Sequence, residues 1–162
     1  MVELLNMRSL IIYLSVHHQN TEKIAIAIAE VIQAETKKIN DVCNEDLLSH
    51  DIIGFGSGIY YGKHHKNLLN FIDNMADMNR KPVFIFSTSG GANGIKYHKE
   101  LRNKLIKKNC SIIGEFNCLG WDSNGPLMLI GGIHKNRPNE NDLENARKFA
   151  ITLKEKLNTK SL

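Results

Sequence analysis

Short apolar runs recur along the chain, separated by segments whose apolar residues repeat every three or four positions. Four of these runs have the length of a strand and are apolar on both faces, which is typical of a parallel sheet that is covered on both sides. The weakest run is the second one, which is mostly polar. The predicted strands are residues 10–14, 35–39, 52–56, 83–86 and 111–116.

The segments between these runs have the pattern of amphipathic helices. The first begins at Asn20 and extends to Gln33. Its alternating isoleucines and alanines also fit a strand, but its length, alanine content and N-terminal residues favour a helix. The other predicted helices are residues 45–49, 68–76, 95–109 and 143–157. This alternation predicts an α/β fold, a doubly wound sheet of five parallel strands with helices on both faces.

The 162 residues fit a single domain, residues 1–162, without an internal repeat, a low-complexity segment or an interdomain linker. Apolar residues make up 42% and charged residues 23%, an ordinary globular composition. One long irregular stretch, residues 118–141, precedes the last helix. Residues 127–130 are predicted to form a small element within it.

Several classes of protein are not expected. Apolar runs such as residues 10–14 are far too short to span a bilayer, and the N-terminus lacks the pattern of a secretory signal. The cysteines are Cys43, Cys110 and Cys118, an odd number without a CxxC pair, which argues against a disulfide framework and a cysteine-held metal site. We therefore expect a cytoplasmic protein that does not act at a membrane.

Charge is distributed unevenly in this chain, whose net charge is +4. Residues 1–81 have a net charge of −2 and residues 82–162 a net charge of +6. The densest basic stretch, residues 96–108, contains six lysines and arginines against one acidic residue, Glu100. A solvated helix face and a docking face for an acidic partner both fit this stretch. It contains no known nucleic-acid-binding motif, so nucleic acid is not an expected partner.

In an open α/β sheet, ligands bind at the carboxyl ends of the strands, where the strand order reverses. The loop after the first strand is polar and leads directly into a helix, whose free N–H groups and dipole favour a phosphate. It contains no lysine or arginine, so neutral donors would have to bind the dianion; a plain helix cap is the alternative. The candidate residues here are Ser15, His17, His18, Gln19, Asn20 and Thr21.

Two further loops complete the candidate site. The loop after strand 52–56 combines glycines with two adjacent tyrosines, which would either stack on a planar ring or pack in the core. The loop after strand 83–86 is small, polar and flexible. A ligand with a phosphate at one end and a flat ring at the other fits all three loops, and FMN is the clearest candidate. The candidate residues are Ser57, Gly58, Ile59, Tyr60, Tyr61, Gly62, Ser87, Thr88, Ser89, Gly90 and Gly91.

Other phosphate-binding families of this architecture do not match. The chain has no GxxxxGK[ST] segment, which excludes a P-loop, and residues 54–58 do not form the GxGxxG fingerprint of dinucleotide-binding folds. A phosphorylated receiver domain would need acidic residues after the first strand and an aspartate at the end of the third. This chain has residues 15–17 and Gly56-Ser57 at those positions.

At these loops the sequence resembles the flavodoxin family, over essentially its whole length. The segments that match the three flavin loops of the family are Tyr13, Ser15 and Asn20-Thr21-Glu22, then Tyr61-Gly62, then residues 87–91. Residues 118–140 are similar to a subgroup of the family found in anaerobes. The resemblance implies a flavodoxin-like sheet of order 2-1-3-4-5 that binds FMN between strands one and three.

The chain also departs from the family pattern. His18-Gln19 replaces the usual Thr-Gly and the loop is one residue longer, which makes His17 and His18 candidate phosphate partners. The third loop lacks the aromatic residue that often covers the second face of the flavin; Trp121 could cover it or pack elsewhere. Typical flavodoxins are strongly acidic, whereas this chain is basic, so the usual basic redox partners are not expected.

The resemblance implies an electron-transfer protein that carries electrons on non-covalent FMN and whose redox partner proteins dock at the flavin edge. In the family, the peptide after the aromatic residue flips on reduction, and glycine at Gly62 makes such a flip cheap. Two alternatives remain: an FMN-dependent NAD(P)H:quinone-type oxidoreductase whose pocket includes residues 118–141, and a binding module that has lost the flavin. No catalytic acid or nucleophile is evident, since nothing in the sequence pairs Cys118, Asp122 or His134.

Overall fold

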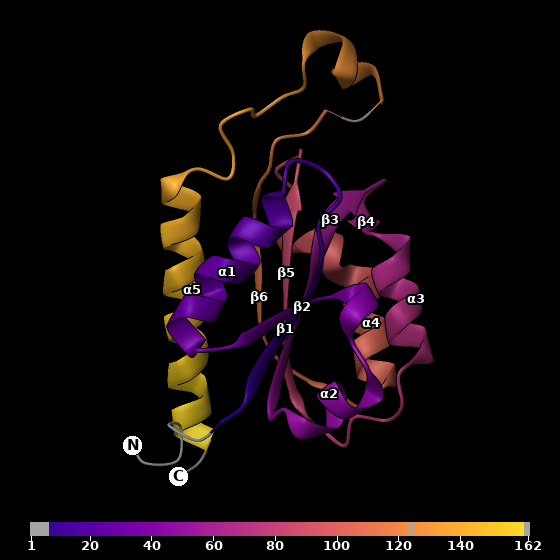
Figure 1. Ribbon diagram of the computed structural model, residues 1–162, viewed down its shortest axis with the longest axis vertical. Helices are drawn as coiled ribbons and strands as arrows, with labels where there is room; N and C mark the ends of the chain where they lie inside the picture. The colour runs from indigo at the N-terminus through magenta and orange to yellow at the C-terminus, as the bar shows by residue number, and fades with distance from the viewer. Residues whose placement is uncertain (1–6, 124, 161–162) are drawn as a thin grey trace.

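The computed structural model describes residues 7–123 and 125–160. Its central layer is a parallel sheet with the strand order β2-β1-β3-β5-β6 (Figure 1). The strands are β1 (Ser9–Leu14), β2 (Glu35–Lys38), β3 (Ile52–Tyr60), β5 (Pro82–Ser89) and β6 (Ser111–Leu119). The predicted α/β class is confirmed, and the five predicted strands lie in the predicted order.

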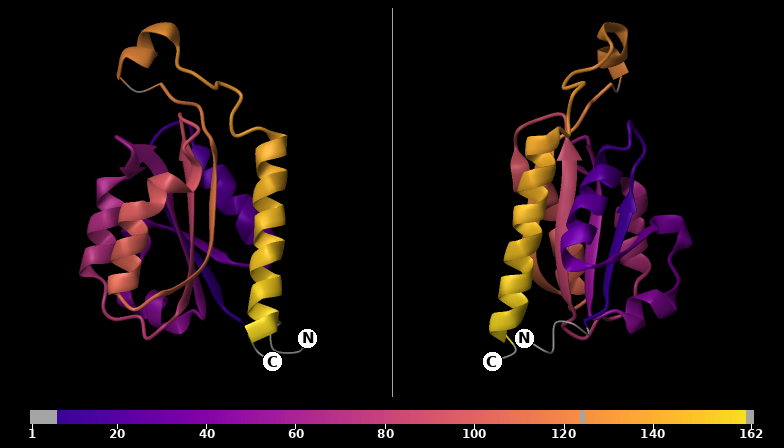
Figure 2. Two further views of the ribbon diagram at one scale, coloured as in Figure 1. Left: turned by 180° about the vertical axis from the view of Figure 1, so that it is seen from behind. Right: turned by 60° about the vertical axis from the view of Figure 1, so that its left-hand side comes forward.

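Helices cover both faces of this sheet (Figure 2). On one face lie α1 (Asn20–Ile32) and α5 (Glu140–Lys160), and on the other α3 (Lys66–Asn74) and α4 (Lys99–Lys107). The shorter helices are α2 (Asn44–Ser49) and the 3₁₀ helices η2 (Ile39–Asp41), η3 (Gly94–His98) and η4 (Gly125–Ile130). No helix within the described residues is long and apolar enough to cross a membrane.

Strand β1 explains why both faces of the sheet are covered. Successive side chains of a strand point to opposite faces. Leu10 and Ile12 accordingly pack in the core beneath α3 and α4, whereas Ile11 and Tyr13 pack beneath α1 and α5. All four side chains are at most 5% exposed. The continuous apolar run of β1 therefore supplies two separate cores, one on each side of the sheet.

The hairpin after β3 and the helical segment before β6 differ from the prediction. β3 runs past the predicted strand end at Gly56, because a short strand, β4 (Lys63–His64), folds back antiparallel on it. The two residues between them, Tyr61 and Gly62, have φ angles of 52° and 78°, and two positive φ angles are what a two-residue type I′ hairpin turn requires. The single helix predicted over residues 95–109 is divided into η3 and α4.

The long segment between β6 and α5 extends beyond the end of the sheet at the top of Figure 1. It is tied to itself by backbone hydrogen bonds in both directions between Asp122 and Ile133. The small element predicted at residues 127–130 is present as η4. Met128, Leu129 and Ile130 in this helix are largely exposed.

The central strand β3 passes very close to two phenylalanine rings of its neighbour β5. A Cβ added to Gly54 would lie 2.2 Å from the ring of Phe84, and one added to Gly56 would lie 2.2 Å from the ring of Phe86. Both rings are completely buried. The rings therefore occupy the volume that side chains on β3 would need.

We expect Gly54→Ala to lower the free energy of unfolding by about 1–3 kcal/mol, because the added methyl group overpacks a rigid core. Chemical denaturation measures this change. Phe84→Leu removes the ring atoms that the methyl group would meet, so the double variant should lose less stability than the two single variants together. Strictly additive losses would show that this contact is not the cause.

Candidate functional site

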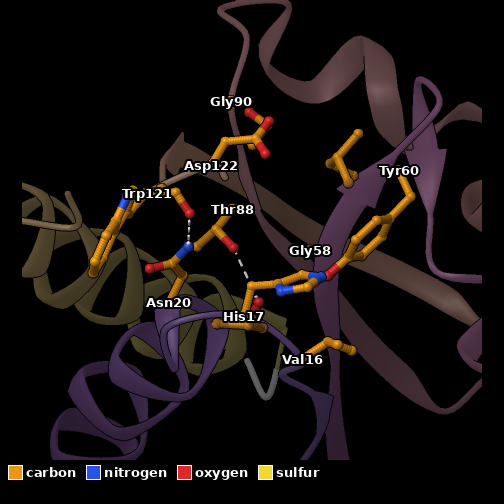
Figure 3. A pocket seen from close by; sticks show the side chains of 13 residues that line it. Val16, His17, Asn20, Gly58, Tyr60, Thr88, Gly90, Trp121 and Asp122 are labelled. Carbon is orange, nitrogen blue, oxygen red and sulfur yellow. Dashed lines mark hydrogen bonds between the residues drawn. The ribbon is translucent and has the colours of Figure 1, made fainter. Parts of the chain in front are cut away.

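A pocket opens at the carboxyl ends of the parallel strands, where the loops after β1, β3, β5 and β6 meet (Figure 3). It is an open pocket with an empty volume of about 340 Å³, a figure that includes the solvent at its mouth. The residues that line it are Val16, His17, Asn20, Thr21, Gly58, Ile59, Tyr60, Thr88, Ser89, Gly90, Gly120, Trp121 and Asp122.

The floor of the pocket is the loop that leads from β1 into α1. His18 and Gln19 both have left-handed backbone conformations, with φ angles of 52° and 55°. Gln19 stands at the N-cap of α1, but no side chain there forms a capping hydrogen bond. The N–H of Asn20 donates a hydrogen bond of 3.3 Å to the His17 carbonyl, and no side chain of the cap residue satisfies the N–H groups that follow, so these are available to an anion.

Two polar atoms of this loop are buried without a partner, the Ser15 hydroxyl and Asn20 Oδ1. The other atom of the Asn20 amide, Nδ2, donates a hydrogen bond of 2.8 Å to the Trp121 carbonyl. A buried polar atom without a hydrogen bond costs about 1–3 kcal/mol. Asn20 lines the pocket, so a ligand bound there would satisfy its amide oxygen, and the Ser15 hydroxyl lies in the same loop.

Aromatic residues stand at opposite sides of the pocket, Tyr60 on one side and Trp121 on the other (Figure 3). His18 stacks on Trp121, with ring centroids 3.5 Å apart and ring planes 12° from parallel. His18 also forms a hydrogen bond of 2.8 Å with Ser123. The loop after β1 is thus attached to the segment after β6, which lies more than 100 residues away in sequence.

Three glycines let backbone and side chains approach closely around the pocket. A Cβ on Gly58 would lie 3.0 Å from the ring of Tyr60, and one on Gly120 would lie 2.8 Å from Asn20 Nδ2. At Gly90 a Cβ would lie 2.3 Å from the carboxylate of Asp122. Any side chain at these positions would displace a residue that lines the pocket.

Asp122 also lines the pocket, although the sequence pattern did not mark it as a site residue. Burial of the Tyr60 ring raises the pKa of that residue above its usual value, and the negative charge of Asp122 raises it further. Asp122 reaches this position only because the chain after β6 turns back over Gly90. No local sequence signal could have placed it there.

A second polar cluster lies in the interior, at the ends of β3 and β5. His64 forms a hydrogen bond of 2.9 Å with Ser57, and His98 forms one of 2.7 Å with Ser87. The two imidazole rings are 5.0 Å apart and are almost completely buried. His64 Nε2 and His98 Nδ1 have no hydrogen-bond partner. Within the described residues, no group of three or more potential ligand side chains could hold a metal ion.

Burial determines the protonation of this pair. It lowers the pKa of His64 well below its usual value, and the neighbouring His98 lowers it further. Burial also lowers the pKa of His98 to about 4, although Glu115 opposes this effect from 3.6 Å away. Both histidines are therefore neutral at pH 7.

A comparison with protein families identifies the architecture. A family model for the flavodoxin domain matches residues 10–120, which is more than half of the chain. The chain belongs to the flavodoxin family. Members of this family bind flavin, typically FMN.

Individual proteins agree with this assignment. An uncharacterized protein of Methanocaldococcus jannaschii is 48% identical over 149 residues, covering 91% of this chain and 98% of that protein. A flavodoxin from the domain Archaea has a similar structure, with a TM-score of 0.71 and 19% identity over 94% of this chain and 99% of that one. A WrbA-like flavodoxin from Agrobacterium tumefaciens follows, with a TM-score of 0.63 and 20% identity over 93% and 99%.

The residues of this flavodoxin-family site fit the chemistry of FMN. The N–H groups at the uncapped start of α1 are donors for a phosphate, and the Ser15 hydroxyl lies in the loop that leads to them. Asn20 Oδ1 is an acceptor for a ligand hydroxyl. Tyr60 offers an aromatic surface for a planar ring. Glycines at the close approaches leave room that side chains would fill.

The structure brings together ten of the predicted site residues in the lining of the pocket: His17, Asn20, Thr21, Gly58, Ile59, Tyr60, Thr88, Ser89, Gly90 and Trp121. Ser15, His18 and Gln19 belong to the same loop but do not line it. The side chains of Ser57 and Ser87 are fully buried and form hydrogen bonds with His64 and His98. They therefore do not face the ligand.

The tip of the second loop lies outside the pocket. Tyr61 is completely exposed, at 104%, and Gly62 and Gly91 are exposed beside it. Between the two tyrosines, it is Tyr60 that faces the pocket. The sequence does not distinguish Tyr60 from Tyr61, because the direction of each ring depends on the hairpin that β3 forms with β4. Val16, Gly120 and Asp122 complete the lining, although the sequence did not mark them.

We expect the free energy of unfolding to fall as the pH decreases from 6.5 to 4. In this range the unfolded chain binds protons at His64 and His98 that the folded protein does not. Each such histidine contributes a slope of about 1.4 kcal/mol per pH unit. Denaturation at a series of pH values measures the slope.

The variant His98→Gln should be less stable at pH 7 but show a shallower slope below pH 6.5. The exposed residue His134 provides the matched control, and His134→Gln should leave the slope unchanged. An unchanged slope in His98→Gln would contradict the assignment.

Proposed function

We propose that this flavodoxin-family protein binds FMN non-covalently and transfers electrons between redox partner proteins. The observation that carries the proposal is the uncapped start of α1, with an unpartnered hydroxyl and an unpartnered amide oxygen beside it. Among the described residues these two atoms have no hydrogen-bond partner, and a ligand with a phosphate and hydroxyl groups would satisfy them. FMN is such a ligand, and when bound it supplies reversible uptake and release of single electrons.

The residues of the chain have distinct roles in this proposal. Neutral donors of the loop after β1 bind the phosphate without help from a lysine or arginine. Asn20 also holds the segment after β6 through its bond to the Trp121 carbonyl. Thr21 and Thr88, whose hydroxyls are 3.0 Å apart, join α1 to the end of β5 beneath the ligand. These two hydrogen bonds join the loops after β1, β5 and β6 around the pocket.

A second candidate function is an FMN-dependent NAD(P)H:quinone-type oxidoreductase. The feature that favours it is the segment of residues 120–139, which contributes both Trp121 and Asp122 to the pocket and extends beyond the sheet. A substrate pocket needs such a wall, whereas a carrier needs only an exposed flavin edge. The fold is shared with a WrbA-like protein, so fold alone does not separate the two functions.

We expect Ser15→Ala to weaken FMN binding by at least tenfold, since a hydrogen bond to a charged group is worth about 1.5–3 kcal/mol. The same variant should leave the ligand-free protein equally stable or more stable, because its hydroxyl is buried without a partner. Quenching of FMN fluorescence measures the affinity, and thermal unfolding measures the stability.

The matched control is Ser111→Ala, a partly buried serine at the other end of the sheet. It should leave FMN affinity unchanged. Equal affinities of Ser15→Ala and the wild type would remove Ser15 from the site. A protein that does not take up added FMN at all would contradict the proposed function.

Anaerobic stepwise reduction of the FMN-loaded protein separates the two functions. A carrier should pass through a one-electron-reduced flavin with a long-wavelength absorption band, and it should oxidise NAD(P)H slowly even when a quinone is present. Direct loss of the flavin bands in a two-electron step, together with steady NAD(P)H oxidation, would instead identify a reductase.

A further inference from the structure

A basic surface adjoins the pocket on the far side of the β3–β4 hairpin. An open hollow there is lined by Tyr61, Gly62, Lys63, Lys96, Tyr97 and Lys99, together with Glu100 and Asn103 from α4. We call the three exposed lysines Lys63, Lys96 and Lys99 the lysine rim. The lysine rim lies next to the proposed FMN site. Tyr97 lines the hollow, and its hydroxyl lies 2.5 Å from where a Cβ on Gly91 would be. Gly91 directly follows Gly90, which lines the pocket.

The charge of the lysine rim is poorly balanced by its neighbours. Lys63 forms an ion pair of 3.3 Å with Glu100. In the part of the chain that the structure describes, no carboxylate lies within 4.0 Å of Lys96 or Lys99. Exposed lysines without an ion-pair partner attract a protein surface of opposite charge and speed its association.

The same excess extends along the whole ligand-binding edge of the sheet. The segments that form this edge are residues 15–19, 61–65, 90–98 and 120–139, and they contain four basic residues and one acidic residue. The acidic one, Asp122, lines the pocket itself. Two of the four basic residues are already paired, Lys63 with Glu100 and Arg137 with Asp142, so the positive excess in these segments rests on Lys96 and Lys135.

Tyr61 provides an apolar contact beside the lysine rim. Its side chain is completely exposed and its backbone is left-handed, with a φ angle of 52°. A residue other than glycine in this conformation carries strain, and such strain is concentrated at functional positions. Tyrosine is enriched at the centres of protein interfaces, surrounded by polar residues. The hairpin therefore presents an aromatic anchor within a ring of positive charge.

We propose that the lysine rim and Tyr61 form the docking surface for an acidic electron-transfer protein, which delivers its electron to the adjacent pocket. This inference rests on the proposed function. In the transfer, one electron leaves the metal centre of the partner and is taken up by FMN, and no bond forms or breaks. The partner is oxidised by one electron and FMN is reduced by one electron.

Two other anionic ligands fit this surface less well. A nucleotide needs enclosed donors, and the hollow is open, with its lysines exposed to solvent. A nucleic acid would need basic residues along a continuous path, and this edge contains no known nucleic-acid-binding motif. A compact acidic protein needs only the complementary field and the central aromatic contact.

The test uses an acidic [2Fe–2S] ferredoxin as the probe. Calorimetric titration measures its affinity for the protein with and without FMN, and stopped-flow absorption measures reduction of the FMN-loaded form by the reduced ferredoxin. Both affinity and rate should fall as the salt concentration rises. The double variant Lys96→Glu/Lys99→Glu should weaken binding at low salt at least tenfold and slow the transfer to a similar extent.

The matched control is Lys148→Glu/Lys154→Glu, which makes the same change in net charge on α5, across the sheet. It should change binding less than threefold. Tyr61→Ala should weaken binding several-fold without altering the salt dependence. Equal losses in the two charge variants would overturn the proposal, because only net charge would then matter.

The remaining outcomes separate this inference from the proposed function. Binding that depends on the lysine rim in the absence of FMN uptake would support the docking surface while contradicting the FMN carrier. A protein that binds FMN and is reduced by dithionite, but shows no affinity for the ferredoxin, would overturn the docking surface alone. Rim-dependent binding of a DNA duplex in place of the ferredoxin would also overturn it.

Discussion

The close approach of β3 to the rings of Phe84 and Phe86 is the constraint on which the rest of the molecule depends. β3 is the central strand and pairs with β1 on one side and β5 on the other. Glycines at positions 54 and 56 leave the space that the two buried rings fill. This packing fixes the strands whose ends support the loops of the pocket, so the geometry of the site follows from the interior of the sheet.

The pocket at the end of these strands is built from neutral groups. Its phosphate-binding end relies on the start of α1 and on unpartnered polar atoms rather than on a cation, and Asn20 connects it to the chain after β6. Asp122 is the one carboxylate in the lining, which contains no lysine or arginine, whereas the exposed Lys63, Lys96 and Lys99 lie outside the pocket. Positive charge is thus placed where a partner would approach and is absent where the phosphate would bind.

The two buried histidines connect the site to the interior. Ser57 and Ser87 lie at the ends of the two strands that carry the second and third loops, and each is held by an imidazole. Asn117 on β6 donates a further hydrogen bond of 2.8 Å to the Ser87 hydroxyl. The loops therefore stand on a polar network that is rigid while the histidines are neutral, and that becomes costly when they acquire charge.

The sequence by itself determined the elements that local pattern controls. Apolar runs specified four of the five strands, since burial on both faces demands them, whereas β2 is polar and mostly exposed. The polar residues after β1 and the glycine-rich loops specified the ligand-binding edge. Only the tertiary structure decided which tyrosine faces the pocket, that Ser57 and Ser87 turn inward to His64 and His98, and that Asp122 reaches Gly90. Each of these three arrangements depends on contacts between different elements of the fold. The periodicity of apolar residues carries no information about such contacts, because it records only which side chains are buried.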